Sequence, residues 1–443
     1  MKGKYRKDFT GTCTFKQKGI NNMRECGMLL PIASLPSKYG IGCFSKEAYK
    51  FVDQLKEAGQ SFWQILPLGP TGFGDSPYQA FSAFAGNPYF IDLEQLVGEG
   101  LLTEDECEEA DFGDDDRYIA YDKIYKARFK VLKKAYERWK KDHHQFLKSK
   151  LDPETIEYCF YMAVKDHFKS ASWNKWDKDI RLRKPAAVEK YKKMLADEIG
   201  FYEFQQFEFN EQWSRLKAYA NENGIRIIGD IPIYVAFDGA DSWAHPELFQ
   251  FDEECLPKAV AGCPPDAFSA TGQLWGNPLY DWGYHKKDHY SWWIKRMEYS
   301  LKLYDVVRVD HFRGFEAYYS IPYGDPTAEF GHWEKGPGLD LFARLKKSLK
   351  KEELPIIAED LGFLTPEVHE IGFPGMKVLE FAFDDSENSD YLPHKYQENC
   401  IVYTGTHDNE TLVGWYENMN RRNKSFAREY MGCRHTPKKE MHW

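Results

Sequence analysis

The sequence has no long hydrophobic run: no stretch approaches the roughly 20 apolar residues that a membrane-spanning helix needs. The basic N-terminal segment is not followed directly by an apolar signal core, because the nearest apolar run, residues 28–33, is short and holds a proline. Nine cysteines are scattered without a C-x-x-C pair, which argues against a disulfide framework or a zinc ribbon. These absences predict a soluble, cytoplasmic protein with no membrane partner.

The chain also lacks an excess of basic residues. Its formal net charge is −10, whereas a nucleic-acid-binding surface needs a basic face for the phosphates. No G-x-S-x-G motif marks a serine nucleophile, and no glycine-rich loop marks a phosphate site. No nucleic-acid partner is therefore expected.

Aromatic residues, in contrast, are abundant. Trp, Tyr and Phe make up 16% of the 443 residues, a content that fits either a heavily packed core or a lined binding groove. With 42% hydrophobic and 29% charged residues, the composition is typical of a globular protein. The length fits several domains or one large barrel that carries insertions.

Short β-branched runs, each ending in polar residues and a loop, recur along the chain. Such runs predict buried parallel strands, and the amphipathic segments between several of them, such as 45–59 and 340–352, predict helices. Seven strands, several of which end in charged residues, favour an α/β fold of the (β/α)8 TIM-barrel type, with a doubly wound sheet as the alternative. The runs are residues 27–34, 61–69, 225–235, 305–312, 355–362, 376–383 and 400–408.

Two features depart from a simple barrel. Residues 98–215 have Lys, Glu, Tyr and Trp at helical spacing and predict a helical insertion between the second and third strands. Residues 1–97 are then the first part of the barrel and residues 216–443 its remainder. Only seven strands can be counted, so we expect the eighth, barrel-closing strand to be absent from this chain and the barrel to expose two strand edges.

Three acidic residues end three of the predicted strands: Asp310, Glu359 and Asp408. Strand ends converge on one pocket in a barrel, where one carboxylate can attack or stabilise a cation while another transfers a proton. Arg308 lies two residues before Asp310, so both side chains point to one side of the strand and the guanidinium can keep the carboxylate ionised. A structural ion pair is the alternative for this pair alone, and three acidic strand ends together favour catalysis.

A metal site is less favoured, because Asp310/His311 and His407/Asp408 are adjacent residues whose side chains face opposite sides of a strand. No metal and no cofactor are predicted. Two Gly- and Pro-containing loops, residues 75–90 and 261–282, carry many of the aromatic residues. Flat sugar faces stack on such rings, and amide or carboxylate groups bind sugar hydroxyls, although a well-packed loop anchored by Trp275 is the simpler interpretation of any one ring.

Seven motifs occur in an order that resembles glycoside hydrolase family 77, the 4-alpha-glucanotransferases (amylomaltases or disproportionating enzymes) of the α-amylase clan. The resemblance extends from about Gly27 to Tyr416. Its motifs are GMLLPIASLPSKYGIG, DSPYQAFSAFAGNPYFIDL, GDIPIYV, PPDAFSATGQLWGNPLYDW, RVDHFRG, AEDLG and YTGTHDN.

Position by position, the resemblance implies that Asp310 is the nucleophile, Glu359 the general acid/base and Asp408 the transition-state stabiliser. Further positions match substrate-binding residues of the family or clan. They are Arg308, His407, Asp230, Tyr78, Trp275, Asn277 and, near a further contact, Asp384.

The resemblance implies a retaining double displacement that transfers an α-1,4-glucan segment from a donor maltooligosaccharide to the 4-hydroxyl of an acceptor glucan or glucose. Such a reaction belongs to starch, glycogen and maltodextrin metabolism. An α-glucan hydrolase with the same three acids and a non-catalytic glucan-binding protein are the competing hypotheses. Family members continue past position 443 with a barrel-closing segment, so an incomplete, poorly stable or inactive chain is also expected.

Overall fold

The computed structural model describes residues 12–13, 24–72, 74–115, 117–141, 150–266, 269–361, 371–383 and 389–432. Within these ranges, no helix is both long and apolar enough to cross a membrane. Seven cysteines of the same ranges are free thiols: Cys26, Cys43, Cys107, Cys159, Cys255, Cys263 and Cys400.

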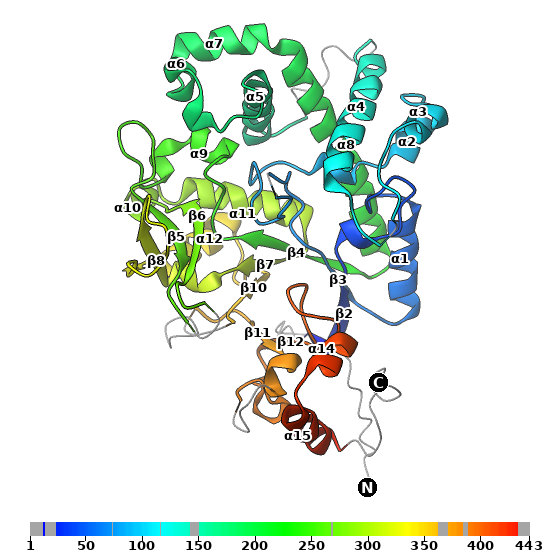
Figure 1. The fold of residues 1–443 in the computed structure, drawn as a ribbon, viewed down its shortest axis with the longest axis vertical. Coiled ribbons are helices and arrows are strands. Elements are labelled where there is room, and N and C mark those ends of the chain that lie inside the picture. The colour runs from blue at the N-terminus through cyan, green and yellow to red at the C-terminus, as the bar shows by residue number, and fades with distance from the viewer. Residues whose placement is uncertain are drawn as a thin grey trace.

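A large sheet of mainly parallel strands forms the centre of the molecule (Figure 1). Its order is β10-β7-β4-β3-β2-β1-β12-β11, and the predicted α/β fold with parallel strands is confirmed. All seven predicted strands are present. They are β2 (Glu25–Leu29), β3 (Phe62–Gln64), β4 (Arg226–Pro232), β7 (Val306–Asp310), β10 (Ile356–Ala358), β11 (Gly375–Val378) and β12 (Cys400–Tyr403).

The position between β2 and β12 is occupied by β1 (Thr12–Cys13), a strand that was not predicted. It runs antiparallel to both neighbours, pairing Thr12 with Cys26 and Cys13 with Ile401. The expectation of two exposed strand edges is therefore corrected over these residues, because β1 takes up backbone groups that an open edge leaves unpaired. At the other end of the sheet, the Ala358 N–H donates to the Pro374 carbonyl across 3.0 Å, which links β10 to the chain before β11.

The strand side chains that point into the barrel form two layers, one apolar and one polar. Residues 62, 228, 306, 357, 376 and 401 form one buried apolar cluster with Tyr403. The residues two positions further along three of these strands are Gln64, Asp230 and Arg308. Because the side-chain period of a strand is two, these polar groups stand above the apolar layer on the same inner face.

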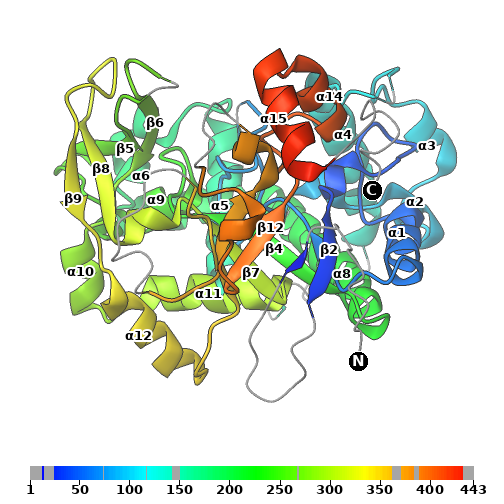
Figure 2. The same cartoon turned by 90° about the horizontal axis from the view of Figure 1, so that it is seen from below.

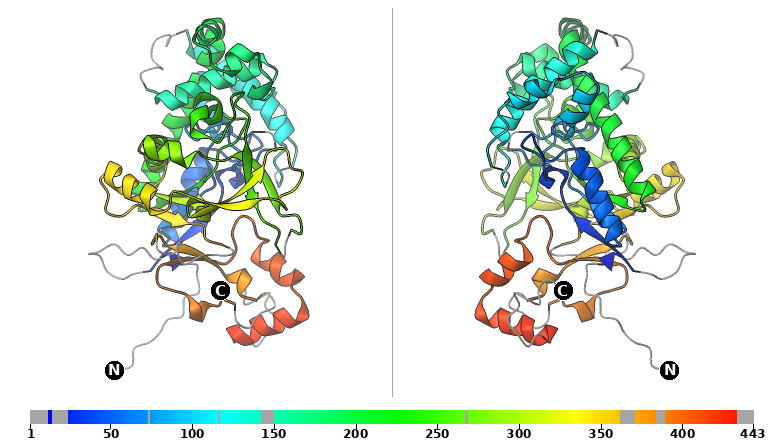
Figure 3. Two further views of the ribbon diagram at one scale, coloured as in Figure 1. Left: turned by 90° about the vertical axis from the view of Figure 1, so that its left-hand side faces the viewer. Right: turned by 90° about the vertical axis from the view of Figure 1, so that its right-hand side faces the viewer.

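Helices form the segment between β3 and β4, and those from α4 to α7 lie far from the C-terminal helices (Figures 1 and 3). Helix α8 continues through position 215, so the domain boundary predicted there falls inside a helix. The helices are α2 (Leu93–Gly98), α3 (Glu104–Glu108), α4 (Tyr121–Trp139), α5 (Pro153–His167), α6 (Lys178–Arg181), α7 (Pro185–Met194) and α8 (Ala196–Glu222).

The buried amides of α8 hold the backbone of the loop that follows β3. Gln206 accepts a hydrogen bond from the Gly86 N–H at 2.7 Å and donates to the Gly86 carbonyl at 2.8 Å. Gln212 accepts from the Asp92 N–H at 2.7 Å. Both glutamines are fully buried, so each bond lies where water cannot replace it. The helix therefore sets the path of residues 86–92.

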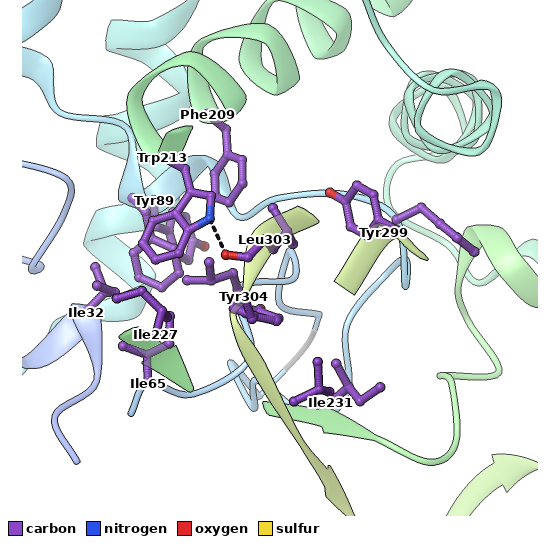
Figure 4. Packing of buried hydrophobic residues seen from close by; sticks show 14 of the residues in the cluster. Ile32, Ile65, Tyr89, Phe209, Trp213, Ile227, Ile231, Tyr299, Leu303 and Tyr304 are labelled. Atoms are coloured by element: carbon purple, nitrogen blue, oxygen red, sulfur yellow. Dashed lines mark hydrogen bonds between the residues drawn. The ribbon is translucent and has the colours of Figure 1, made fainter. Parts of the chain in front are cut away.

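Further along α8, Phe209 and Trp213 pack into the main core (Figure 4). The Trp213 indole N–H donates to the Leu303 carbonyl at 3.1 Å, at the end of α11 (Ser291–Leu303). Ile32, Ile65 and Ile227 belong to the same cluster. One helix thus connects the helical segment to the outer wall of the barrel.

A second, four-stranded antiparallel sheet has the order β6-β5-β8-β9. Figure 2 shows it on the opposite side of the molecule from α1 (Lys46–Glu57). Its strands are β5 (Ala259–Cys263), β6 (Gln273–Pro278), β8 (Ala317–Pro322) and β9 (His332–Lys335). The remaining α-helices of the described ranges are α9 (Ala240–Ala244), α10 (Trp282–Lys287), α12 (Leu339–Leu349), α14 (Leu412–Asn418) and α15 (Arg421–Met431).

A partly buried carboxylate joins α5 to α11 and to the end of α9. Glu154 accepts from Lys295 at 2.7 Å and lies 2.9 Å from His245 Nε2. Burial lowers the pKa of His245, but its bonds to Glu154 and Glu247 outweigh burial and raise it from 6.5 to about 9. His245 is therefore a cation at neutral pH.

This ion pair predicts a pH-dependent stability. A raised histidine pKa stabilises the folded state fully below pH 6.5, and the contribution is lost as pH rises through about 9. We expect the wild-type protein to lose up to about 3 kcal/mol of unfolding free energy over this range through His245. Urea unfolding at both ends of the range measures it. His245→Gln should lack this part of the pH slope, and an unchanged slope in that variant would contradict the assignment.

Candidate active site

The strands bring one cation and two carboxylates into direct contact. Arg308 Nη1 lies 2.8 and 2.6 Å from the two carboxylate oxygens of Asp230, and Arg308 Nη2 lies 3.0 Å from Asp310 Oδ1. The strand register explains this meeting, since Asp230 on β4 pairs directly with Arg308 on β7. Arg308 and Asp230 are buried at 3% and 0% exposure, whereas the Asp310 side chain is 33% exposed.

Of Asp230, Arg308 and Asp310, only Asp310 therefore has a side chain that is partly exposed to solvent. Burial raises the pKa of its carboxyl from 3.8 to about 7, although the guanidinium of Arg308 acts in the opposite direction. The Arg308 pKa stays well above its usual value, because the charges of Asp230 and Asp310 outweigh the effect of burial. Arg308 therefore remains a permanent cation that favours the ionised form of Asp310.

Glu359 follows β10, the strand next to β7. Its Oε2 accepts from the His311 N–H at 2.9 Å, and its Oε1 accepts from the Leu361 N–H at 2.9 Å. Burial raises the pKa of Glu359, while Arg308 and these two N–H groups act in the opposite direction. Its carboxyl is fixed in orientation by two backbone contacts and has a raised affinity for a proton.

Tyr78, from the loop after β3, bridges two other candidate residues. Its hydroxyl lies 2.8 Å from Asp230 Oδ2 and 2.8 Å from His407 Nε2, and its ring stacks on His407 at 5.7 Å between centroids. Burial and the charge of Asp230 raise the pKa of Tyr78 far above 10, so the phenol stays protonated. A phenol donates one proton, so donation to Asp230 requires that His407 donates from Nε2.

His407 in turn lies beside Asp408. The distance from His407 Nε2 to Asp408 Oδ2 is 3.2 Å, and the side chains are 11% and 71% exposed. Burial lowers the pKa of His407, which keeps the imidazole neutral. The Asp408 carboxylate is thus oriented at its inner side and open at its outer side, where it can contact a bound molecule.

Trp275 and Asn277, both on β6, have different surroundings. The Trp275 ring is half-buried and meets the His311 ring edge-to-face at 4.7 Å. Asn277 is 5% exposed, and its amide is bonded to Val235 and to Gln79. Asn277 therefore connects β6 to the loop that carries Tyr78. Asp384 lies outside the described residues.

His311 is a site residue whose position was not predicted. It adopts the left-handed conformation, with φ of 52°, directly after Asp310. Its N–H contacts Glu359 and its ring contacts Trp275, while burial lowers its pKa to about 4. His311, with its neutral ring and its left-handed backbone, therefore connects Glu359 to the half-buried ring of Trp275. The sequence offers no signal for this, because the conformation is set by the contacts around it.

The described residues contain no group of three or more His, Cys, Asp or Glu side chains placed to hold a metal ion. The arrangement instead offers a partly exposed carboxylate (Asp310) beside a fixed cation, a second carboxyl of raised proton affinity after the neighbouring strand (Glu359), and a third acid (Asp408) that is largely exposed. Such a set suits nucleophilic attack coupled to proton transfer.

The buried ion pair of Arg308 and Asp230 predicts that removing its cation strongly lowers the free energy of unfolding. In Arg308→Met, the Asp230 carboxylate stays fully buried without its partner, which should cost about 3–5 kcal/mol of unfolding free energy. Urea unfolding measures the loss. The double variant Arg308→Met/Asp230→Asn serves as the control and should recover part of it, because the uncompensated charge is gone. A single variant as stable as the wild type would contradict the prediction.

The sequence profile of glycoside hydrolase family 77, described as 4-alpha-glucanotransferase, matches residues 30–443. The chain is 53% identical over 394 residues to the 4-alpha-glucanotransferase of Clostridium butyricum, covering 87% of this chain and 80% of that protein. It is 46% identical over 429 residues to that of Thermus thermophilus, covering 92% and 83%.

Solved structures agree. The amylomaltase of Streptococcus agalactiae in complex with acarbose superposes with a TM-score of 0.89 at 44% identity, covering 94% of this chain and 85% of that chain. The amylomaltase of Corynebacterium glutamicum, at 21% identity and a TM-score of 0.72, shares the fold. The chain therefore belongs to glycoside hydrolase family 77, the 4-alpha-glucanotransferases, which transfer α-1,4-glucan segments.

Proposed function

We propose that Asp310, Glu359 and Asp408 perform the glucan transfer of this family by a retaining double displacement. The observation that carries the proposal is the meeting of Asp310 with Arg308 at 3.0 Å, beside a strand that ends in Glu359. A nucleophilic carboxylate must be ionised while its partner acid holds a proton. Burial raises the pKa of both carboxyls, so the division of roles is supported by geometry: the Arg308 guanidinium lies 3.0 Å from Asp310, whereas the oxygens of Glu359 accept hydrogen bonds from two backbone N–H groups.

In the first step, Glu359 protonates the glycosidic oxygen and Asp310 attacks the anomeric carbon. The C–O bond to the leaving glucan breaks, and an ester bond between Asp310 and the sugar forms. In the second step, Glu359 removes the proton of an acceptor 4-hydroxyl, whose oxygen displaces Asp310. Asp408, oriented by His407, stabilises the positive charge that develops on the sugar in both steps.

The substrates that we propose are maltooligosaccharides as donors, with glucans or glucose as acceptors. The neighbour from Streptococcus agalactiae was solved with acarbose, and the aromatic residues Tyr78 and Trp275 suit the stacking of glucose rings. Arg308, Asp230 and His407 would hold the sugar at the reaction centre, and Asp384 is proposed as a further contact. Asn277 would act indirectly, by fixing the Tyr78 loop through Gln79.

We further propose that the enzyme works in the cytoplasm. Nine cysteines without paired spacing suit a reducing compartment, and the seven free thiols support that interpretation.

Maltotriose tests the reaction. We expect the wild-type protein to convert it to glucose plus longer maltooligosaccharides, because acceptor sugar competes with water for the covalent intermediate. Chromatography of the products measures this. Shortening without any lengthening would indicate hydrolysis, and unchanged maltotriose would contradict catalysis by this chain.

A fluoride donor separates the two proposed catalytic roles. Glu359→Gln should reduce transfer from maltotriose by about 10²–10⁴-fold, since the leaving oxygen loses its proton donor. α-Maltosyl fluoride needs no proton to release fluoride, so this variant should still give a stoichiometric burst of fluoride. Asp310→Asn, the matched change of a carboxyl to an amide, should give no burst. A burst from Asp310→Asn, or none from Glu359→Gln, would reverse or refute the assignment.

A further inference from the structure

Arg296, on α11, is a buried cation that the proposed reaction does not use. Its side chain is 2% exposed. The rings of Trp292 and Trp293, on the same helix, lie against its guanidinium, with centroids 5.4 and 4.9 Å away. Because a buried guanidinium loses its water, an arginine at this position lowers stability unless its N–H groups bind buried acceptors.

The acceptors are backbone carbonyls just beyond Asp230. Arg296 Nη1 donates to the Ile233 carbonyl at 2.9 Å, and Nη2 donates to the Pro232 carbonyl. Strand β4 ends at Pro232, so Arg296 supplies hydrogen-bond donors at the point where the strand ends. A cation is thus used to fix main chain and not to pair with a substrate.

One of these peptide groups contacts the backbone of Asp310. The Pro232 carbonyl and the Ile233 N–H belong to the same peptide group, and this N–H donates to the Asp310 carbonyl at 3.3 Å. Pro232 also pairs with Asp310 in the register of β4 and β7. A peptide group is planar, so fixing its oxygen also fixes the direction of its N–H, and a cation bound to the oxygen strengthens the N–H as a donor. Arg296 therefore holds the main chain of Asp310 through a single peptide group.

The second carbonyl connects the same cation to the aromatic side of the site. The Tyr280 hydroxyl donates to the Ile233 carbonyl at 2.9 Å and lies 3.4 Å from the guanidinium. The Tyr280 ring stacks on Tyr234 at 6.2 Å between centroids. The Tyr234 ring in turn lies 6.3 Å from the ring of Trp275 and 6.4 Å from that of His311. The support of Asp310 and the support of these rings meet at one guanidinium.

A buried carboxylate on α9 is electrostatically linked to Arg296. Burial lowers the pKa of Arg296, whereas Tyr280 and Asp241 act in the opposite direction. Asp241 also accepts from the Ala83 N–H at 2.9 Å, in the loop that carries Tyr78. The cation at the end of β4 and the anion that holds this loop therefore stabilise each other.

We propose that Arg296 is a positioning residue for Asp310. By binding the Pro232–Ile233 peptide group, it holds the backbone of Asp310 where the carboxylate can attack the anomeric carbon. The proposal rests on the proposed role of Asp310 as nucleophile. Attack requires the reacting atoms to be in near contact, and a misplacement of about 1 Å can lower the rate by about 100-fold. Arg308 fixes Asp310 at its side chain, and Arg296 fixes it at its main chain.

The test measures the attack by Asp310 separately from proton transfer. In the Glu359→Gln background, the burst of fluoride from α-maltosyl fluoride reports this step alone. The burst is recorded over a range of donor concentrations for the parent, Arg296→Lys and Arg296→Met. Urea unfolding gives the folded fraction of each variant, so that rates are expressed per folded molecule. Arg128→Met is the matched control, since Arg128 is also fully buried and donates to a backbone carbonyl, that of Ile91, at 2.7 Å.

We expect Arg296→Met to lower the maximal burst rate about 10- to 100-fold and to change the half-saturating donor concentration less than about threefold. Arg296→Lys should recover part of the rate, because it keeps the charge and one donor for these carbonyls. Arg128→Met should lose stability but keep the burst rate per folded molecule. An unchanged burst rate in Arg296→Met, or an equal loss in Arg128→Met, would refute positioning, since both are expected if Arg296 only supports folding.

Hydrogen exchange tests the contact itself. The Ile233 N–H should exchange at least about tenfold faster in Arg296→Met than in the parent, and Arg128→Met should not show this increase. Mass spectrometry of a peptide that contains Ile233 measures it. Unchanged exchange would refute the chain of bonds from Arg296 to Asp310 whether or not the protein transfers glucan. Absence of a burst in the Glu359→Gln parent would instead overturn the roles proposed for the acids.

Discussion

The guanidinium of Arg308, buried between Asp230 and Asp310, is the interaction on which the site depends. A buried cation is tolerated only when anions and hydrogen-bond acceptors surround it, and here Asp230 on β4 and Asp310 on β7 supply them. Asp230 is fully buried and Asp310 is partly open, so one carboxylate neutralises the cation while the other remains available to a substrate. The polar layer of the barrel is thus built around a charge that cannot be removed by a change of pH.

The other groups of the site are arranged outward from this trio. Tyr78 reaches Asp230 from the loop after β3, and through the same hydroxyl it positions His407, which orients Asp408. On the opposite side, His311 connects Glu359 to Trp275. Asp310 and Asp408 each lie beside one basic side chain and stay partly exposed, whereas both oxygens of Glu359 accept backbone N–H groups. This division between support and access is what electrostatic preorganisation requires.

Much of this organisation could be predicted from the sequence, because parallel strands leave a strong local signal. Short β-branched runs located all seven strands, and the position of Asp310, Glu359 and Asp408 after such runs placed them at one end of a barrel. The spacing of Arg308 and Asp310 predicted their contact correctly. What could not be predicted depends on tertiary contacts. Strand β1 is two residues long, the left-handed backbone of His311 has no sequence signature, and the bonded amide of Asn277 depends on a loop about 200 residues away.

The contact between Gly86 and α8 has a consequence for the evolution and redesign of this enzyme. A Cβ atom at position 86 would lie 2.2 Å from the ring of Phe209, and Gln206 binds both backbone groups of the glycine. The loop and the helix therefore form one structural unit, although more than a hundred residues separate them in the chain. A substrate loop borrowed from a relative will keep its shape only when the matching turn of α8 is transplanted with it.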